Sequence, residues 1–313
     1  MSDGAAGAGD ARTGVLAAIA AYTCWGFFPL YFLALKQVGA YELLADRILF
    51  AVPFGALIIM ARGQTAAVMA GLRDRRVLLA LFLSAGVVAL NWLVYIVAVQ
   101  NAHIFEASLG YYINPLIYVL VGVIVLGERL RPGQIAAVAL ATLGVAVLTV
   151  GGGKFPLVSL VLAVSFTVYG YVRKTIAIGA MPGLFIETLL LAPFAALGLW
   201  WLTASGDAVL PSAMRGPPGA WDWGLVGALA FAGPATVVPL LFFAIGARRL
   251  TLATLGFLQF IGPTIQFLVG LWAGEAFTPA HQVCFALIWL AAAVFAMDAW
   301  RAHHPRRAVA EQV

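Results

Sequence analysis

The stretch EASLGYYINPL, from Glu106 to Leu116, lies inside an apolar run that extends over residues 104–126. A helix needs about 20 predominantly apolar residues to cross the hydrocarbon core of a bilayer, and this run has that length. Tyr111, Asn114 and Tyr118 follow the spacing i, i+3, i+7, which places them on one face of a helix. The stretch therefore predicts a membrane-spanning helix with one polar stripe.

Nine further apolar segments accompany this one along the 313 residues. Numbered as spans 1 to 10, the segments are residues 14–35, 41–61, 77–99, 104–126, 133–150, 155–172, 181–203, 223–246, 251–273 and 280–300. Hydrophobic residues make up 63% of the chain and charged residues 10%, whereas soluble domains have about 45–50% and about 25%. The composition predicts an all-α membrane protein with ten transmembrane helices. It excludes a cytosolic enzyme, a disordered chain and a secreted disulfide scaffold.

The basic residues predict the orientation of the spans. With the N-terminus inside the cell, 14 of the 18 Lys and Arg residues fall in cytoplasmic segments, as the positive-inside rule requires. Both termini are then cytoplasmic, with a disordered tail over residues 1–13 and a second tail over residues 301–313. Because basic loops account for the net charge of +5, this charge does not indicate a nucleic-acid partner.

The two halves of the chain resemble each other. Residues 22–27 (YTCWGF) match residues 166–171 (FTVYGY), and three further matches follow in the same order at similar offsets. Since five is an odd number, a five-span unit that occurs twice must enter the membrane in opposite directions. We expect residues 14–150 and 155–300 to form two inverted repeats. This architecture is typical of secondary transporters, whose substrate site lies near the bilayer midplane between the repeats.

Span 9 repeats the polar stripe of span 4. Adding 148 to the positions of Tyr111, Pro115 and Tyr118 gives Gln259, Pro263 and Gln266. Polar residues in a membrane either hydrogen-bond between helices or line a cavity, and the repetition favours a cavity. With aromatic and polar residues of spans 3 and 6 added, the candidate substrate-binding residues are Asn91, Trp92, Tyr95, Tyr111, Asn114, Tyr169, Gln259 and Gln266. The candidate hinges, where a helix can bend, are Gly26, Gly170, Pro115 and Pro263.

Few charges fall inside the spans. Asp46 and Arg47 lie in span 2, Glu187 lies in span 7, and Arg173 follows span 6. Such charges are costly in a bilayer unless they are paired or hydrated. Two interpretations remain open for Arg47, Arg173 and Glu187: a structural pair between helices, or a protonatable carboxylate that couples transport to the proton gradient.

Several of these stretches resemble one known family. Residues 91–95 (NWLVY), 106–116 (EASLGYYINPL) and 254–267 (TLGFLQFIGPTIQF) are similar to the RarD group of the EamA family, in the drug/metabolite transporter superfamily. The resemblance implies a ten-helix permease of the bacterial inner membrane, and some members carry the label "chloramphenicol-sensitive protein". The chain departs from the family in span 2, where Asp46-Arg47 stands in place of the usual His-Arg.

The sequence thus favours a secondary transporter that moves a small organic metabolite or drug-like molecule by alternating access. Its expected partners are this substrate and the bilayer, with protons if transport is coupled, and no cofactor is expected. The alternatives are a non-transporting scaffold or sensor and, less favoured, an intramembrane enzyme. A catalytic set is not evident, because the four histidines lie near span ends or in the tail. Neither a Walker motif nor a metal-ligand spacing around Cys24 and Cys284 is present.

Overall fold

The computed structural model describes residues 3–126, 131–153, 155–215, 217–247, 249–250 and 258–303. Its longer helices are α1 (Asp3–Gly26), α3 (Ala40–Ala61), α5 (Arg75–Gln100), α6 (Ile104–Leu126), α7 (Pro132–Gly152), α8 (Leu157–Thr175), α9 (Ala180–Ser205), α12 (Ala232–Ala247), α14 (Ile261–Trp272) and α15 (Pro279–His303). The shorter ones are α2 (Phe28–Ala34), α4 (Thr65–Arg73), α10 (Leu210–Ala213), η1 (Pro218–Ala220) and α11 (Trp223–Ala230).

Within these described ranges, seven helical stretches are long and apolar enough to cross a membrane. They are Arg12–Ala34, Ala40–Ala61, Arg75–Gln100, Pro132–Gly151, Ala180–Ser205, Trp223–Gly246 and Pro279–Asp298. Leu157–Arg173 and Ile261–Trp272 are shorter apolar helices, and α6 occupies the predicted span 4. The chain is therefore a helical, multi-pass membrane protein. Part of predicted span 9, residues 251–257, lies outside the described residues.

Two predicted spans are each built from two helices. Span 1 is divided between α1 and α2 at Phe27, and the predicted span 8 is divided between α11 and α12 at Phe231. The first break follows from Pro29, which cannot donate a backbone hydrogen bond to the carbonyl of Trp25, four residues earlier. At the N-terminal end, α1 already begins at Asp3, inside the segment predicted to be a disordered tail. Several alanines between residues 5 and 11 favour this helix.

The surface of the protein is unusually apolar. Large apolar residues face outward, with Val150 86%, Trp272 76% and Leu79 71% exposed. The interior is also largely apolar, but it encloses several charged and amide side chains, namely Glu42, Asp46, Arg47, Asn91, Asn114, Glu187 and Gln266. This arrangement places the apolar surface against lipid tails and keeps the polar groups between helices.

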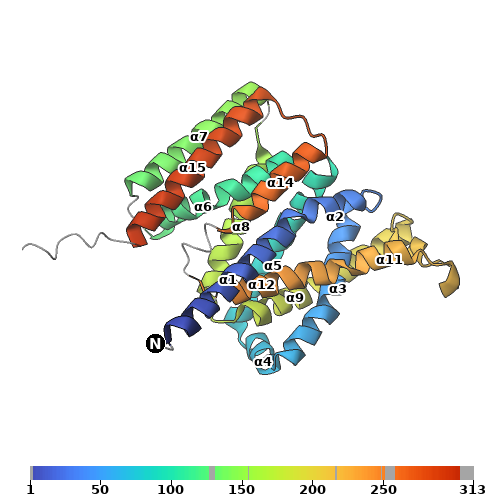
Figure 1. Cartoon of the computed structure of the whole chain (residues 1–313). Helices are drawn as coiled ribbons and strands as arrows, with labels where there is room; N and C mark the ends of the chain where they lie inside the picture. Colours follow the sequence, from blue (N-terminus) through green and yellow to red (C-terminus); the bar gives the residue numbers. More distant parts are fainter. Residues whose placement is uncertain are drawn as a thin grey trace, which may run out of the picture.

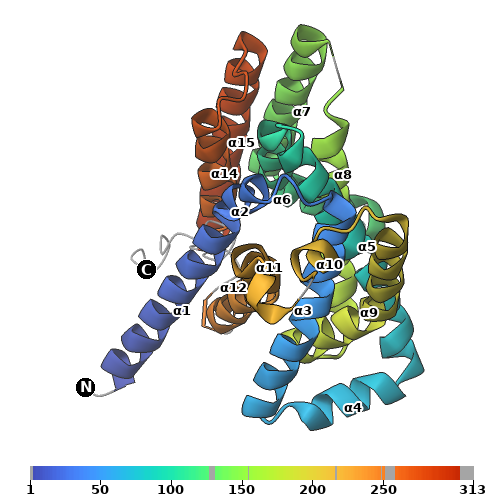
Figure 2. The same ribbon diagram turned by 90° about the vertical axis from the view of Figure 1, so that its right-hand side faces the viewer.

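The helices pack in pairs that relate the two halves of the chain. At one edge α7 and α15 lie side by side (Figure 1), and α12 lies between α1 and α3 (Figure 2). The other main contacts are α3 with α9, α5 with α8 and α9, α6 with α8 and α14, and α1 with α14. If each helix is exchanged for its counterpart in the other predicted repeat, this set of pairs is unchanged. For example, the α1–α12 contact becomes the α8–α5 contact.

Glu275, in the segment between α14 and α15, caps the N-terminus of α6. Its Oε2 accepts hydrogen bonds from the backbone N–H groups of Ile104 at 2.7 Å and Phe105 at 3.1 Å. These are donors that a helix leaves without intrahelical partners. The contact ties the beginning of span 4 to the end of span 9 across 171 residues of sequence.

The Glu275 cap predicts a pH dependence of stability. Burial raises the pKa of Glu275 from 4.5 to about 7, although the backbone hydrogen bonds lower it. The folded protein therefore retains a proton that the unfolded chain releases, and this stabilisation is complete below about pH 4.5 and lost as the pH rises through about 7. We expect the thermal midpoint in detergent to fall between about pH 4.5 and 7 more steeply in the wild type than in Glu275→Gln. Identical pH profiles for the two proteins would contradict this assignment.

Candidate functional site

A chain of hydrogen bonds joins α5, α6 and α8 within the protein. The Tyr111 hydroxyl donates to Oδ1 of Asn91 at 3.2 Å. Nδ2 of Asn91 donates to the Ser165 hydroxyl at 2.9 Å and to the backbone carbonyl of Leu162 at 3.0 Å. Asn91 is fully buried and Tyr111 is a partly exposed residue, so the hydrogen bonds connect a buried contact between helices to a residue at its edge.

Aromatic rings extend from this chain along the same three helices. The rings of Tyr95 and Tyr111 are 5.7 Å apart, those of Tyr111 and Phe166 are 5.9 Å apart, and those of Phe166 and Tyr169 are 6.0 Å apart. These separations fall within the range for favourable aromatic pairs. The rings form an apolar wall with few polar groups, as small-molecule sites commonly have.

Arg47 projects from α3 toward α5 and α12. Its Nε donates to the Thr236 hydroxyl at 2.8 Å, and its guanidinium lies 4.2 Å from the ring centroid of Trp92 and 5.3 Å from that of Phe28. The guanidinium is thus held by two aromatic faces and one hydroxyl. Cation–π contacts of this kind stabilise a desolvated arginine.

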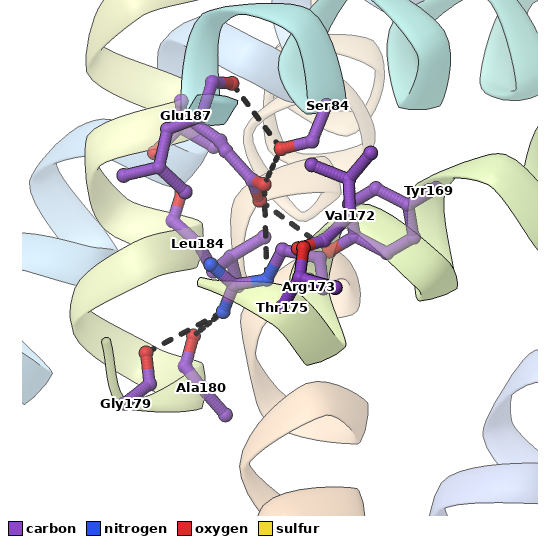
Figure 3. A network of polar contacts seen from close by, with 11 residues as sticks. Ser84, Tyr169, Val172, Arg173, Thr175, Gly179, Ala180, Leu184 and Glu187 are labelled. Carbon is purple, nitrogen blue, oxygen red and sulfur yellow. Dashed lines mark hydrogen bonds and ion pairs between the residues drawn. The ribbon is translucent and has the colours of Figure 1, made fainter. Parts of the chain in front are cut away.

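A second polar cluster surrounds Glu187 on α9 (Figure 3). Nε of Arg173 lies 3.8 Å from Oε1 of Glu187, the Tyr169 hydroxyl donates to Oε2 at 3.3 Å, and the Ser84 hydroxyl donates to Oε1. Gly183 leaves space for the guanidinium, because a Cβ at that position would overlap Nη1 of Arg173. The cluster joins α5, α8 and α9 through one buried carboxylate.

Gln266 has a structural partner in the other half of the chain. Its Nε2 donates to the backbone carbonyl of Trp25 at 3.2 Å, the carbonyl that Pro29 leaves without a helical donor. Next to this bond α1 and α14 approach closely, since a Cβ on Gly26 would lie 2.6 Å from Cβ of Ile265. Gln266 therefore connects α14 to the break in span 1.

The structure brings only some of the predicted site residues together. Asn91, Tyr95 and Tyr111 lie next to one another on α5 and α6, whereas Trp92, also on α5, lies against Arg47. Asn114 accepts a hydrogen bond from the Thr167 hydroxyl at 2.8 Å in the α6–α8 contact. Tyr169 is directed to Glu187, and Gln259 lies partly buried in the turn before α14. The stripes on spans 4 and 9 occupy matching positions in the sequence, but their described polar residues do not contact one another.

The predicted hinges differ in their local structure. Gly26 ends α1, where span 1 is broken. α6 and α8 run through Pro115 and Gly170 without a break, and Pro263 lies in the first turn of α14, where a missing N–H breaks no intrahelical bond. Among the described residues, spans 1 and 8 are broken at Phe27 and Phe231, and α6 is continuous through Pro115. In span 9 a turn at Gln259 and Phe260 precedes α14.

Several residues that contact the candidate site residues were not predicted from the sequence. Ser84 lies seven residues before Asn91 and so shares its helix face, a signal that the stripe on span 3 already contained. Phe28 and Thr236 carry no such signal, because they meet Arg47 from α2 and α12. Among the described residues, no group of three His, Cys, Asp or Glu side chains could hold a metal ion.

This fold, with polar groups enclosed between apolar helices, defines a multi-pass helical membrane protein. The model of the EamA-like transporter family matches residues 12–150. Protein RarD of Salmonella typhimurium is 44% identical, over 92% of this chain and 96% of its own length. An uncharacterized transporter of Vibrio cholerae is 42% identical, over 95% and 96%. The chain therefore belongs to the EamA-like transporter family and, within it, to the RarD group, as its motifs predicted.

Two more distant likenesses agree with this membership. A protein of Pseudomonas aeruginosa named chloramphenicol-sensitive protein RarD is 34% identical, over 92% of this chain and 95% of its own length. One solved crystal structure is 22% identical, with a TM-score of 0.57, and the match covers 92% of this chain and 99% of that one. The second likeness concerns the fold alone.

Proposed function

We propose that this protein is a secondary transporter that moves a small organic molecule across the bacterial inner membrane by alternating access. Both termini lie in the cytoplasm, and two inverted five-helix repeats enclose the substrate site. Spans 1–4 and 6–9 surround this site, while spans 5 and 10 (α7 and α15) lie outside it. The substrate binds beside α5 and α6, and its binding residues include Asn91, Trp92, Tyr95 and Tyr111.

The observation that carries this proposal is the set of helix contacts that stays unchanged when the two halves are exchanged. If the two halves are related by an approximate two-fold rotation, a conformation open to one side of the membrane has a counterpart open to the other side, in which the halves have exchanged conformations. Rocking of one repeat against the other then opens a central site to either side of the membrane. The cytoplasmic orientation of the termini rests on the distribution of Lys and Arg.

The Glu187 cluster joins helices of both predicted repeats, so we expect it to affect this movement. Arg173 lies at the end of α8 and Glu187 lies near the beginning of α9, so their pair joins spans 6 and 7 near the predicted cytoplasmic surface. Glu187→Gln, which cannot exchange a proton, separates a pair that holds the helices together from one that passes a proton.

The test is counterflow into liposomes that contain the purified protein. A panel of three molecules with the same aromatic body covers the three charge states: N-acetylphenylalanine (anion), N-acetylphenylalaninamide (neutral) and phenylalaninamide (cation). We expect the protein to accelerate counterflow of at least one of them over protein-free liposomes. If none is accelerated by protein that remains folded, the proposal is contradicted.

Tyr111→Phe tests the position of the site, with Tyr112→Phe as its matched control. Each variant removes one phenolic hydroxyl and one hydrogen bond, to Asn91 in the first case and to Thr264 at 2.6 Å in the second. Tyr112 is buried between Phe260 and Phe285, away from the partly exposed Tyr111. We expect Tyr111→Phe to lower kcat/KM for counterflow by up to about tenfold, the value of one hydrogen bond, and Tyr112→Phe to change mainly stability. Equal effects of both variants on kcat/KM would argue against the site.

A further inference from the structure

Arg47 is a buried cation without a carboxylate partner. Its side chain is 6% exposed, and among the described residues no Asp or Glu oxygen lies within 4.0 Å of its nitrogens. The hydrogen bond that its Nε donates to Thr236 leaves the two terminal nitrogens of the guanidinium without an acceptor in the described part of the chain. A buried guanidinium with free donors is costly in a membrane protein unless something else accepts from it.

Asp46 does not supply that acceptor. Adjacent residues on a helix point about 100° apart, and the carboxyl oxygens of Asp46 have no hydrogen-bond partner in the described structure. Glu42, one turn earlier, is fully engaged, because it accepts from the backbone N–H groups of Val209 and Leu210 at 2.8 and 2.7 Å. The carboxylates nearest in sequence are thus directed away from Arg47.

A second unpaired donor lies in the same place. The Tyr95 hydroxyl is buried without a hydrogen-bond partner, and this residue is 4% exposed. Tyr95 lies one turn after Trp92 on α5, and the ring of Trp92 covers the Arg47 guanidinium at 4.2 Å. The hydroxyls of the neighbouring Tyr31 and Tyr111 already donate elsewhere, Tyr31 to the carbonyl of Ala228 and Tyr111 to Asn91. The Tyr95 hydroxyl and the Arg47 guanidinium are therefore the groups that remain for a ligand.

We propose that Arg47 and Tyr95 form an anion-recognition site and that the transported molecule is a small organic carboxylate with an aromatic or apolar body. The carboxylate would accept from the terminal nitrogens of Arg47, whose fork matches its geometry, and from the Tyr95 hydroxyl. The body would lie along the rings of Trp92 and Tyr111. This inference rests on the proposed transport function and names its substrate class.

The arrangement favours an anion over the other charge states. A cationic ligand would meet the positive charge of Arg47 at short range. A neutral amide could accept hydrogen bonds but would leave the charge of the guanidinium uncompensated. Trp92 already covers one face of the guanidinium at 4.2 Å, which leaves its edge, the side that carries the donors, for a planar acceptor.

Binding to the full-length protein in lipid nanodiscs tests this inference separately from transport. The probes are again N-acetylphenylalanine, N-acetylphenylalaninamide and phenylalaninamide, measured by titration calorimetry. We expect the wild type to bind the anion at least about tenfold more tightly than the neutral amide, since a charge-assisted hydrogen bond is about twice as strong as a neutral one. Arg47→Gln should remove this preference and leave the affinity for the neutral amide within about threefold.

Three further variants keep the test decisive. Tyr95→Phe should weaken anion binding about threefold to tenfold, and Arg47→Lys, which keeps the charge without the planar fork, should retain part of the preference. Arg131→Gln is the control for loss of a positive charge, because Arg131 forms an ion pair with Asp298 in the peripheral α7–α15 pair and should bind like the wild type. If Arg47→Gln does not fold, the anion affinities of Tyr95→Phe and Arg47→Lys test the inference in its place.

The outcomes separate this inference from the proposed function. It is overturned if the wild type binds the amide or the cation as tightly as the anion, or binds none of the three. It is also overturned if Arg47→Gln keeps the preference for the anion, or if Tyr95→Phe and Arg47→Lys both bind the anion like the wild type. Anion binding without counterflow of any probe would contradict transport alone, and counterflow without anion preference would contradict the inference alone.

Discussion

Glu187→Ala is expected to destabilise the folded protein by about 3 kcal/mol or more, because removal of one partner of a buried ion pair leaves the other charge uncompensated. The remaining charge is that of Arg173, whose side chain is 13% exposed beside the 1% exposed Glu187. Partial access to water places the loss toward the lower end of the usual range of about 3–5 kcal/mol. The Ser84 and Tyr169 hydroxyls would lose their acceptor at the same time. The measurement is the free energy of unfolding in mixed micelles.

The double variant Arg173→Ala with Glu187→Ala is the control for this first prediction. If the pair is the cause, removal of both charges should recover part of the stability lost in Glu187→Ala, so the two changes are not additive. A double variant that loses the sum of the two single effects would show that the ion pair contributes little.

Glu187→Gln separates a structural pair from proton coupling. The single amide oxygen can still accept from one of the two hydroxyls, Tyr169 or Ser84, which donate to different oxygens of the carboxylate, but the amide cannot exchange a proton. If the carboxylate couples transport, this variant should retain counterflow and lose accumulation driven by a pH gradient, and a protonophore should reduce the wild type to the same level. If the pair is only structural, gradient-driven accumulation in Glu187→Gln should fall no further than counterflow does.

The second large effect is expected for Gly233→Ala, at the contact between α12 and α3. A Cβ at this position would overlap the carbonyl oxygen of Phe50 and lie 2.7 Å from its carbonyl carbon. Because the obstacle is backbone, the two helices must separate, and overpacking of this kind costs about 1–3 kcal/mol or more. Thr236 lies three residues further along α12, so the separation should also lengthen its hydrogen bond to Arg47. We expect lower stability together with strongly reduced counterflow.

Gly227→Ala, in the adjoining helix α11, is the matched control for Gly233→Ala. No atom lies within 4 Å of a Cβ built at Gly227, so this exchange should be neutral or stabilise the helix by up to about 1 kcal/mol. The measurements are the thermal midpoint in detergent and the counterflow rate of each variant. If Gly233→Ala proves as stable and as active as Gly227→Ala, the close α3–α12 contact is not required.

Much of the architecture could be predicted because it follows from local properties of the chain. Apolar runs such as residues 41–61 and 77–99 coincide with α3 and α5, since a bilayer admits only helices or closed barrels. The family could be predicted as well, from residues 106–116 and 254–267. The hinge predicted at Gly26 lies next to the break in span 1, where α1 ends. The physical cause of this break, Pro29 four residues after Trp25, was also present in the sequence.

The candidate site could be predicted only in part. Asn91, Tyr95 and Tyr111 could be grouped from the sequence, because two of them share one helix face and the third follows on the next span, and in the structure they are neighbours. Their role in substrate binding stays a prediction. The role of Gln266 was not predictable in the same way, since its hydrogen-bond partner lies 241 residues earlier. Arg47 was expected to form an ion pair or to couple protons. Its observed neighbours are Thr236, Trp92 and Phe28.

Hydrophobicity, helical periodicity and motifs are sufficient to predict that this chain is a helical membrane protein of the EamA-like family and that each charge inside a span needs a partner. Hydrophobicity and helical periodicity are local, so they can be read without knowing how helices meet. The identity of each partner, in contrast, follows only from how the helices pack in three dimensions. Glu187 meets Arg173, whereas Arg47 meets a hydroxyl 189 residues away and aromatic faces. These contacts depend on how closely two helices approach each other, as α3 and α12 do at Gly233. The distance between two helices is set by segments that are far apart in the sequence, so local patterns do not predict it.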